Sequence, residues 1–396
     1  MDSTNRSEFR STIRQLYLLA MAMFLVTIAI GILNGLNVVE FNRDQLLTHV
    51  HSGTLGWISL SIITTTMWMT RSTNSRMAWA LAILIPIYVV AFYTGYLPFR
   101  AIAGSALLIV VLWVFVWVWR GVGANKSLPM LTVALGLTTF AYGAIIGVLI
   151  QIQFATHVQI FPASADIVGA HAAAMVFSYL ILAAMGLIEW RVKNTEGRPT
   201  AGLVQIGALF AGGFVLSGAL LFGGGSAAQA AGGLDLLLNL VAVVLFAVRV
   251  LPSAARVGWG LATGRRHIAT AALFVPLAML IFMYVIYLFI TVGVDGISPR
   301  VLEASDHAAF IGVITNLILG LILTATDDQG EDAGPLGQFG FWVMNAGLLI
   351  FLVGLMADST SIIAVGAPSM GVGILVVLWV CAVRLRASSM AAIEAR

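Results

Sequence analysis

Residues 48–60, THVHSGTLGWISL, place His49 and His51 at the start of an otherwise apolar stretch. Positions i and i+2 on a helix are about 200° apart, because successive residues turn by roughly 100°. The two imidazoles therefore face opposite sides of one helix and cannot readily ligate the same metal. A helix that lies between two cofactors needs such a pair, and neutral imidazole is a common ligand of haem iron and of copper.

The chain that must position these side chains has the composition of an integral membrane protein. Of its 396 residues, 60% are hydrophobic and 9% are charged, whereas a soluble domain carries roughly 25% charged residues. Backbone groups in lipid must be satisfied within the segment, so spans of about 20 apolar residues are helices. Twelve spans are expected, near 13–36, 46–70, 77–96, 100–119, 129–153, 164–190, 199–223, 231–251, 268–292, 303–325, 338–357 and 363–386.

Lysine and arginine predict the orientation, because cytoplasmic loops of membrane proteins carry an excess of both. With the N-terminus inside, all of the 20 basic residues except Arg43, Arg100 and Arg300 fall on the inner side. Both termini are therefore expected in the cytoplasm, which requires an even number of spans. The expected organisation is a cytoplasmic segment 1–12, a single all-α membrane domain 13–386 and a cytoplasmic tail 387–396.

Four of the six histidines fall at a similar depth in the expected helices. His49 and His51 open the second span, His171 opens the sixth and His307 opens the tenth, each a few residues below the outer surface. Ionisable groups inside membrane helices are rare and mark functional sites. Because these histidines recur at every fourth helix, they predict three four-helix units around a pseudo-threefold axis.

Other polar residues near these positions have more than one interpretation. Asp166 and Asp306 lie just outside two of the histidines, where each would either orient an imidazole N–H or cap a helix. The two remaining histidines, His157 and His267, are interpreted as solvated loop residues.

The sequence HVHSGTLGW resembles the tenth-helix motif, H-x-H-S-G-x-L-G-W, of the catalytic subunit of C-family (cbb-type) haem-copper oxidases. In that family the first histidine ligates the high-spin haem and the second ligates the low-spin haem. The resemblance therefore implies these two roles for His49 and His51. Twelve helices in three similar arcs, cytoplasmic termini and outer-face ligands on helices two, six and ten are also similar to that superfamily. The motif covers about nine residues, whereas the topological likeness covers the whole chain.

The chain also departs from the family pattern. The family has its H-x-H pair on helix ten, whereas this chain has it on helix two, which implies a rotated assignment of the arcs. Under that assignment His171 completes the low-spin haem, and His307 corresponds to the first copper ligand. The next helix of the family carries a histidine pair, and QFGFWVMNAGLLIF carries none. Three copper ligands cannot be assembled from this chain, so a conventional binuclear centre that reduces oxygen is not expected. Copper stays an alternative beside a site with haem alone.

Counting ligands leaves two arrangements open. In the first, two bis-histidine haems use all four imidazoles and leave no coordination position for a gas. In the second, His51 and His171 hold a low-spin haem, while His49 holds a five-coordinate haem that faces His307 and binds a diatomic gas. The resemblance favours the second arrangement, because the family motif assigns its two histidines to different haems. One or two haems are expected, of the b type, because the single Cys381 forms no C-x-x-C-H motif.

Haem propionates are anionic, and arginine suits them because its planar guanidinium pairs with carboxylates. Arg43, Arg100 and Arg300 are the basic residues on the expected outer side, so they are the candidate partners. Trp57, which is part of the motif, is a candidate to pack on a porphyrin ring or in the core.

Three functions compete for this chain, which we expect in the inner membrane of a bacterium. The first is a b-type haem oxidoreductase or electron carrier for oxygen or nitric oxide, with electrons from another subunit or from quinol. The second is a non-catalytic haem and copper protein of nitric oxide stress, on a looser similarity to the twelve-helix NnrS family, whose usual H-x-H-E reads HVHS here. The third is a secondary transporter, although no paired half-chain repeat is visible. The isoelectric point of about 9.2 reflects the topology and gives no reason to expect nucleic acid.

Overall fold

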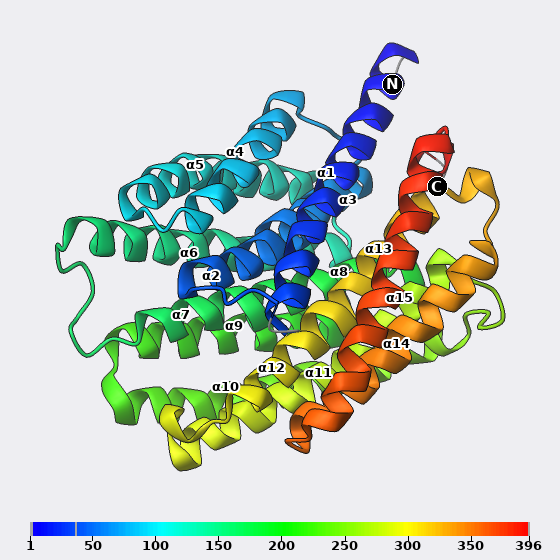
Figure 1. Ribbon diagram of the computed structural model, residues 1–396. Helices are drawn as coiled ribbons and strands as arrows, with labels where there is room; N and C mark the ends of the chain where they lie inside the picture. The colour runs from blue at the N-terminus through cyan, green and yellow to red at the C-terminus, as the bar shows by residue number, and fades with distance from the viewer. Residues whose placement is uncertain (1–2, 36–37, 395–396) are drawn as a thin grey trace.

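The computed structural model describes residues 3–35 and 38–394, and the regular elements among them are all helical (Figure 1). Eleven of the helices are long and apolar enough to cross a membrane. The chain is therefore an all-α protein with the character of an integral membrane protein. The uninterrupted long helices are α1 (Ser3–Gly35), α4 (Ser75–Tyr93), α5 (Leu97–Ala124), α6 (Leu128–Thr156), α9 (Thr200–Phe222), α10 (Gly224–Ala255), α11 (Gly264–Val292), α14 (Gly334–Met356) and α15 (Thr360–Ala387).

Three more helices each contain a π-helical stretch, in which backbone hydrogen bonds join residues five positions apart instead of four and the turn is wider. They consist of α2 (Arg43–His51), η1 (Ser52–Ser59) and α3 (Leu60–Thr70); of α7 (Ile167–Ala173), η2 (Ala174–Leu180) and α8 (Ile181–Val192); and of α12 (Pro299–His307), η4 (Ala308–Thr315) and α13 (Asn316–Ala325). Short 3₁₀ turns complete the described elements: η3 (Val294–Gly296), η5 (Asp327–Gln329) and η6 (Ala391–Ile393).

The helix from α2 to α3 corresponds to the second expected span, and it is not among the eleven apolar candidates. It is more polar than the others, because its N-terminal part carries Arg43, Asp44 and both histidines and its C-terminal part is rich in hydroxyls. The hydroxyls of Thr64, Thr65 and Thr66 each donate to a carbonyl one turn earlier. Such back-bonding satisfies hydroxyls inside an apolar bundle.

The first helix begins at Ser3, well before the span expected at 13–36, whose last residue lies outside the described part of the chain. The C-terminal tail contacts this first part of the helix, because Arg10 forms an ion pair with Glu394 at 2.6 Å. The hydrogen bond from Arg10 also lowers the pKa of Glu394. Both described chain ends therefore lie at one end of the molecule (Figure 1). Of the two expected terminal segments, residues 1–2 and 395–396 are outside the described part.

The same order of elements occurs three times along the chain. A long helix (α1, α6 or α11) packs against a π-containing helix, and a helical hairpin follows (α4–α5, α9–α10 or α14–α15). Neighbouring sets are joined by contacts of α5 with α6 and of α10 with α11, and α15 contacts α1. We refer to these sets as the first, second and third arcs.

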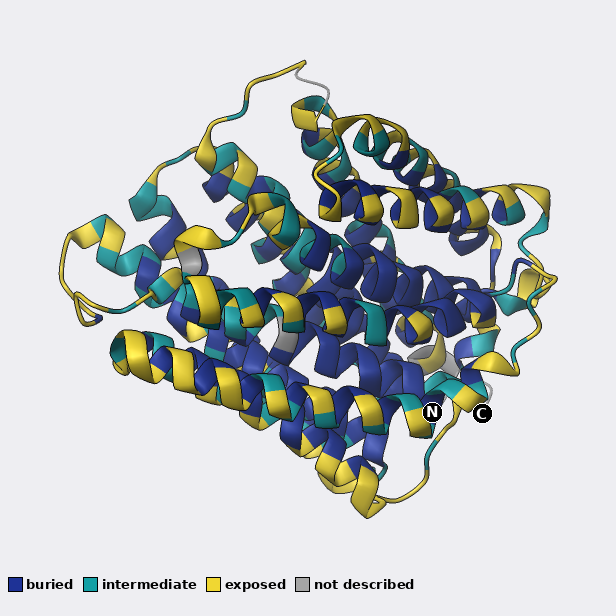
Figure 2. Cartoon of the chain, turned by 90° about the horizontal axis from the view of Figure 1, so that it is seen from below, coloured by how far each residue is buried: buried dark blue, intermediate teal, exposed yellow. Residues whose placement is uncertain are grey.

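The π-containing helices lie toward the middle of the molecule. The inner halves meet there, because α13 contacts both α3 and α8. Figure 2 shows peripheral helices that expose one face and bury the other around a buried centre. In the third arc, 94% of the most apolar stretch of Pro299–Ala325 is buried, which is more than in any other candidate span. The helices that carry the histidines therefore belong to the core.

Candidate functional site

Four half-buried histidines, His49, His51, His171 and His307, lie in the N-terminal parts of the three π-containing helices. The Nδ1 atom of each ring lies 2.7–2.9 Å from a backbone carbonyl oxygen. A carbonyl oxygen only accepts, so each Nδ1 carries the proton and donates it. The Nε2 atoms then keep their lone pairs, which is the form of neutral imidazole that ligates a metal.

Two of these histidines are held by a neighbouring helix. His49 donates to the carbonyl of Thr27 on α1 at 2.8 Å, and His171 donates to the carbonyl of Gly143 on α6 at 2.9 Å. Each of them stands three residues before the π-helical stretch of its own helix. We refer to His49 and His171 as the cross-helix histidines.

The other two are held by their own helix. His51 donates to the carbonyl of Leu47 at 2.7 Å, and His307 donates to the carbonyl of Glu303 at 2.8 Å. Each is the last residue before a π-helical stretch, η1 or η4. We refer to His51 and His307 as the self-anchored histidines. The first and third arcs thus repeat one local arrangement at equivalent positions.

The four histidines form two pairs. His51 interacts electrostatically with His171, and His49 interacts electrostatically with His307. Each pair therefore combines one cross-helix and one self-anchored histidine, from different arcs. The two histidines of the H-x-H sequence contact different helices, His49 through Thr27 on α1 and His51 through Phe92 on α4, in agreement with the opposite directions expected from their spacing.

The π-helical stretches below the histidines satisfy their own backbone groups. Ser59 donates its hydroxyl to the carbonyl of Thr54, and Thr315 donates to that of Phe310, each across five residues. In these two stretches a side-chain hydroxyl therefore adds a hydrogen bond to a backbone carbonyl oxygen. Both hydroxyls stand at the last position of their π-helical stretch. Such turns occur frequently at functional sites.

Trp57 lies in the core and connects two of the arcs. It is 1% exposed, stacks on Phe24 with ring centroids 4.7 Å apart, and donates its indole N–H to the hydroxyl of Thr315 at 3.1 Å. Tyr179 on η2 faces Ser59 on η1 without hydrogen-bond geometry. These contacts set the positions of the three π-helical stretches relative to one another.

Aromatic rings and a buried arginine surround His51. Phe92 stacks on the imidazole with centroids 3.8 Å apart, and Tyr88 meets it edge-on at 6.1 Å. Arg100 is 3% exposed, lies over the Phe92 ring and pairs with Asp44 at 2.7 Å. The sequence interpretation missed Phe92 and Tyr88, because aromatic residues are common in membrane helices and nothing distinguishes these two.

The three arginines proposed for propionates have different surroundings. Arg100 interacts electrostatically with His51. Arg43 is exposed at the first residue of α2. Arg300 pairs with Asp358, and it also donates to Thr360 at 3.3 Å. Arg100 is therefore the best placed of the three, and the propionate role stays a prediction for all of them.

Of the two interpretations of Asp166 and Asp306, the one in which they orient the imidazoles is wrong. The N–H groups of His171 and His307 go to backbone carbonyls instead. Asp166 caps α7 by accepting from the amide of Gly169 at 2.8 Å, which was its other interpretation. Asp306 lies inside α12 and is not the residue that caps it.

The remaining two histidines differ in their surroundings. His157 ends α6 and is exposed, as expected for a loop residue. The same expectation is wrong for His267, which is 1% exposed on α11. Its Nδ1 atom lies 3.2 Å from the amide oxygen of Asn316, and its ring meets Phe341 edge-on at 4.9 Å. These partners allow the helix to begin before His267 and bury it.

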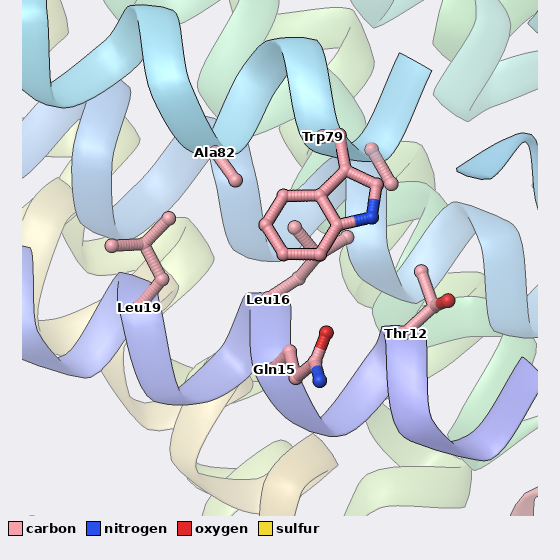
Figure 3. Close-up of a pocket in the computed structure, with 7 residues that line it drawn as sticks. Thr12, Gln15, Leu16, Leu19, Trp79 and Ala82 are labelled. Atoms are coloured by element: carbon pink, nitrogen blue, oxygen red, sulfur yellow. The ribbon is translucent and has the colours of Figure 1, made fainter. Parts of the chain in front are cut away.

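A groove of about 300 Å³ lies between α1 and α4 (Figure 3). On α1 it ends at Leu19, about two turns before Thr27, the residue that holds His49. The groove is therefore separate from the histidine pairs. Its lining residues are Thr12, Gln15, Leu16, Leu19, Ala78, Trp79 and Ala82.

A scan against models of known protein families found no match to the chain, and a search of curated proteins found none either. The chemistry of the site must therefore be inferred from its donors. In the described part of the chain, no group of three or more His, Cys, Asp or Glu side chains is arranged to hold a metal ion. Each histidine pair offers two imidazoles, which is the number of axial positions on haem iron.

Proposed function

We propose that the chain is a b-type haem-binding membrane protein with a haem-copper-oxidase-like arrangement of twelve helices in three arcs. The observation that carries the proposal is the set of four Nδ1-anchored histidines in two pairs on the π-containing helices. The proposal places both termini in the cytoplasm and the histidines near the periplasmic face of a bacterial inner membrane.

The pairing supports one haem at each pair. His51 and His171 would be the two axial ligands of a low-spin haem, whereas His49 would ligate a second haem that faces His307. Haem in such sites supplies electron transfer and, where an axial position is open, the binding of oxygen or nitric oxide. The anchoring hydrogen bonds orient the four rings and raise the basicity of Nε2.

The surroundings of both pairs suit a flat apolar macrocycle. Phe92 and Tyr88 line His51, and Phe351 meets His307 edge-on at 5.0 Å. Aromatic rings present large apolar faces, so they pack well against a porphyrin. Arg100 adds a buried positive charge beside His51, and this guanidinium, which pairs with Asp44, would also attract a propionate.

A second candidate arrangement holds two bis-histidine haems and transfers electrons without binding a gas. It is favoured by the matched anchoring of the two pairs, since each contains one cross-helix and one self-anchored histidine. The electron donor, either a partner subunit or quinol, is part of the proposal in both cases. A non-catalytic role in nitric oxide stress, similar to that of the NnrS family, would use the same histidines.

The proposal is tested by optical spectroscopy of the purified protein in detergent. We expect b-type bands in the reduced-minus-oxidised spectrum, and a carbon monoxide difference spectrum from one of two haems. Two bands that both ignore carbon monoxide would select the bis-histidine arrangement. A protein without haem bands, before and after incubation with haemin, would refute haem binding and leave the secondary transporter as the remaining function of the three.

A further inference from the structure

Two glycines lie directly against the cross-helix histidines. A Cβ atom added at Gly31 would be 2.9 Å from Cε1 of His49, and one added at Gly147 would be 2.8 Å from Cε1 of His171. The imidazole rings cannot move away from such a Cβ atom without breaking the hydrogen bonds from Nδ1 to the carbonyls of Thr27 and Gly143. Each glycine is therefore the residue that leaves room for an anchored imidazole.

The two arcs use the same spacing for this purpose. The accepting carbonyl belongs to the residue four positions before the glycine, Thr27 before Gly31 and Gly143 before Gly147. Residues four apart lie on one helix face, so the carbonyl and the gap face the same ring. Small residues at helix contacts are common in membrane bundles. That tendency does not explain why each glycine lies four residues after the carbonyl that accepts the hydrogen bond of the same histidine ring.

The third arc has a large residue where the other two have glycine. The register is set by two equivalent contacts, Gly56 against Met23 and Gly312 against Phe274, with each glycine four residues after the start of its π-helical stretch. Gly31 stands eight residues after Met23. The residue eight after Phe274 is Phe282, which is buried.

At the position of the cross-helix histidine, the third arc has a small residue. Ser305 stands three residues before η4, where the first two arcs have His49 and His171 before their own π-helical stretches. It is buried, and its hydroxyl has no hydrogen-bond partner. The first two arcs have a glycine on the long helix and a histidine on the π-containing helix, whereas the third arc has Phe282 and Ser305 at these positions. The aromatic ring therefore belongs to the long helix in the third arc and to the π-containing helix in the other two.

In the second arc, the position of the self-anchored histidine is occupied by another residue. His51 and His307 immediately precede their π-helical stretches, and the equivalent residue before η2 is Ala173. Each observed pair joins a cross-helix position of one arc to a self-anchored position of another. The one combination left over joins Ser305 to Ala173, and it contains no imidazole.

We propose that Gly31 and Gly147 are positioning residues, each specific for one of two haems, and that Phe282 closes the equivalent place in the third arc. This inference rests on the proposed function. It adds that the glycines, rather than the histidines alone, determine which arcs accept a cross-helix ligand. The chain consequently has two ligand pairs and a third equivalent position without ligands.

The variants Gly31→Ala and Gly147→Ala test this assignment. Because the added methyl displaces His49, Gly31→Ala should lower the content of the carbon monoxide-reactive haem by about tenfold or more and leave the other haem unchanged. Gly147→Ala should do the reverse. The matched controls are Gly35→Ala and Gly207→Ala, since a Cβ at either position meets nothing within 4 Å.

The readout is the occupancy of each haem, from the reduced-minus-oxidised and carbon monoxide spectra at equal protein concentration. Alanine favours helix more than glycine does, so a weakened helix cannot explain a selective loss. If a variant does not accumulate, the double variant Gly31→Ala/His49→Ala removes the ring that the methyl meets. It should restore accumulation and retain the low-spin haem.

The failure of this inference is distinct from that of the proposed function. Wild-type protein without haem would refute the proposed function and the inference together. Wild-type protein with two haems, combined with glycine variants that keep both or lose both in parallel, would overturn the positioning role alone. Failure of the double variant to accumulate would also count against it.

Discussion

Replacing His51 with alanine is expected to abolish the low-spin, carbon monoxide-insensitive haem signal while the other haem remains. His51 and His171 are the two ligands of that proposed haem, and their anchored rings leave no spare imidazole nearby to substitute. We therefore expect the same result from His171→Ala. Loss of an axial ligand should lower the low-spin signal by more than about tenfold, since even indirect partners of a ligand change metal affinity by 10–100-fold.

The control for this experiment is His157→Ala, which changes an exposed histidine at the end of α6. It should leave both haem signals at the wild-type level. The measurement is the reduced-minus-oxidised spectrum of each variant at equal protein concentration, after size-exclusion chromatography to show that the variant is folded. Retention of the low-spin signal in His51→Ala would contradict the ligand assignment.

Replacing His49 with alanine is expected to remove the carbon monoxide-reactive haem and to leave the low-spin haem. His49 is proposed as its only axial ligand, held in place by the carbonyl of Thr27. In contrast, His307→Ala should retain this haem, because His307 is proposed to face the iron without binding it. We expect its carbon monoxide complex to change, since a polar ring near the bound gas has been removed.

The pair of variants also distinguishes the two ligand arrangements. If both haems are bis-histidine, His307→Ala should instead create a carbon monoxide-reactive haem that the wild-type protein lacks. The measurement is the carbon monoxide difference spectrum of His49→Ala, His307→Ala and wild type, recorded side by side. If the wild-type protein shows a carbon monoxide signal and His49→Ala keeps it in full, His49 is not the ligand of the gas-binding haem and the arrangement with a five-coordinate haem is contradicted.

Much of the helical organisation was predictable from the sequence. Long apolar runs predicted an all-α membrane protein, because helices satisfy their own backbone groups in lipid. The second span was the least apolar, since it carries His49, His51 and a run of hydroxyl residues. The opposite directions of the H-x-H pair also followed from helical spacing alone.

The local geometry at the histidines was not predictable from one sequence. A π-helical stretch depends on where a helix accommodates an extra residue, and tertiary contacts such as that of Trp57 with Thr315 contribute to this. The acceptors of the imidazole N–H groups are backbone carbonyls, which have no side-chain signature. The aspartates were acceptors that the sequence made visible, so they entered the interpretation, whereas the carbonyls of Thr27 and Gly143 did not.

Burial of residues near the ends of the helices was not predictable from the sequence either. His267 follows two arginines, a pattern typical of a cytoplasmic loop, yet it is buried because Asn316 and Phe341 surround it. Gly31 and Gly147 are two of the 40 glycines in the chain, and nothing in the sequence distinguishes them from the others. Only the placement of a histidine ring against each one separates them from ordinary packing glycines.

The haem content of the purified wild-type chain tests the central claim most directly. Pyridine haemochrome spectra and iron analysis should give two haem b and two iron atoms for each polypeptide. A third haem would contradict the closed position at Phe282, and one haem would contradict the two-pair assignment. A colourless polypeptide that takes up no haem on reconstitution would contradict the whole account.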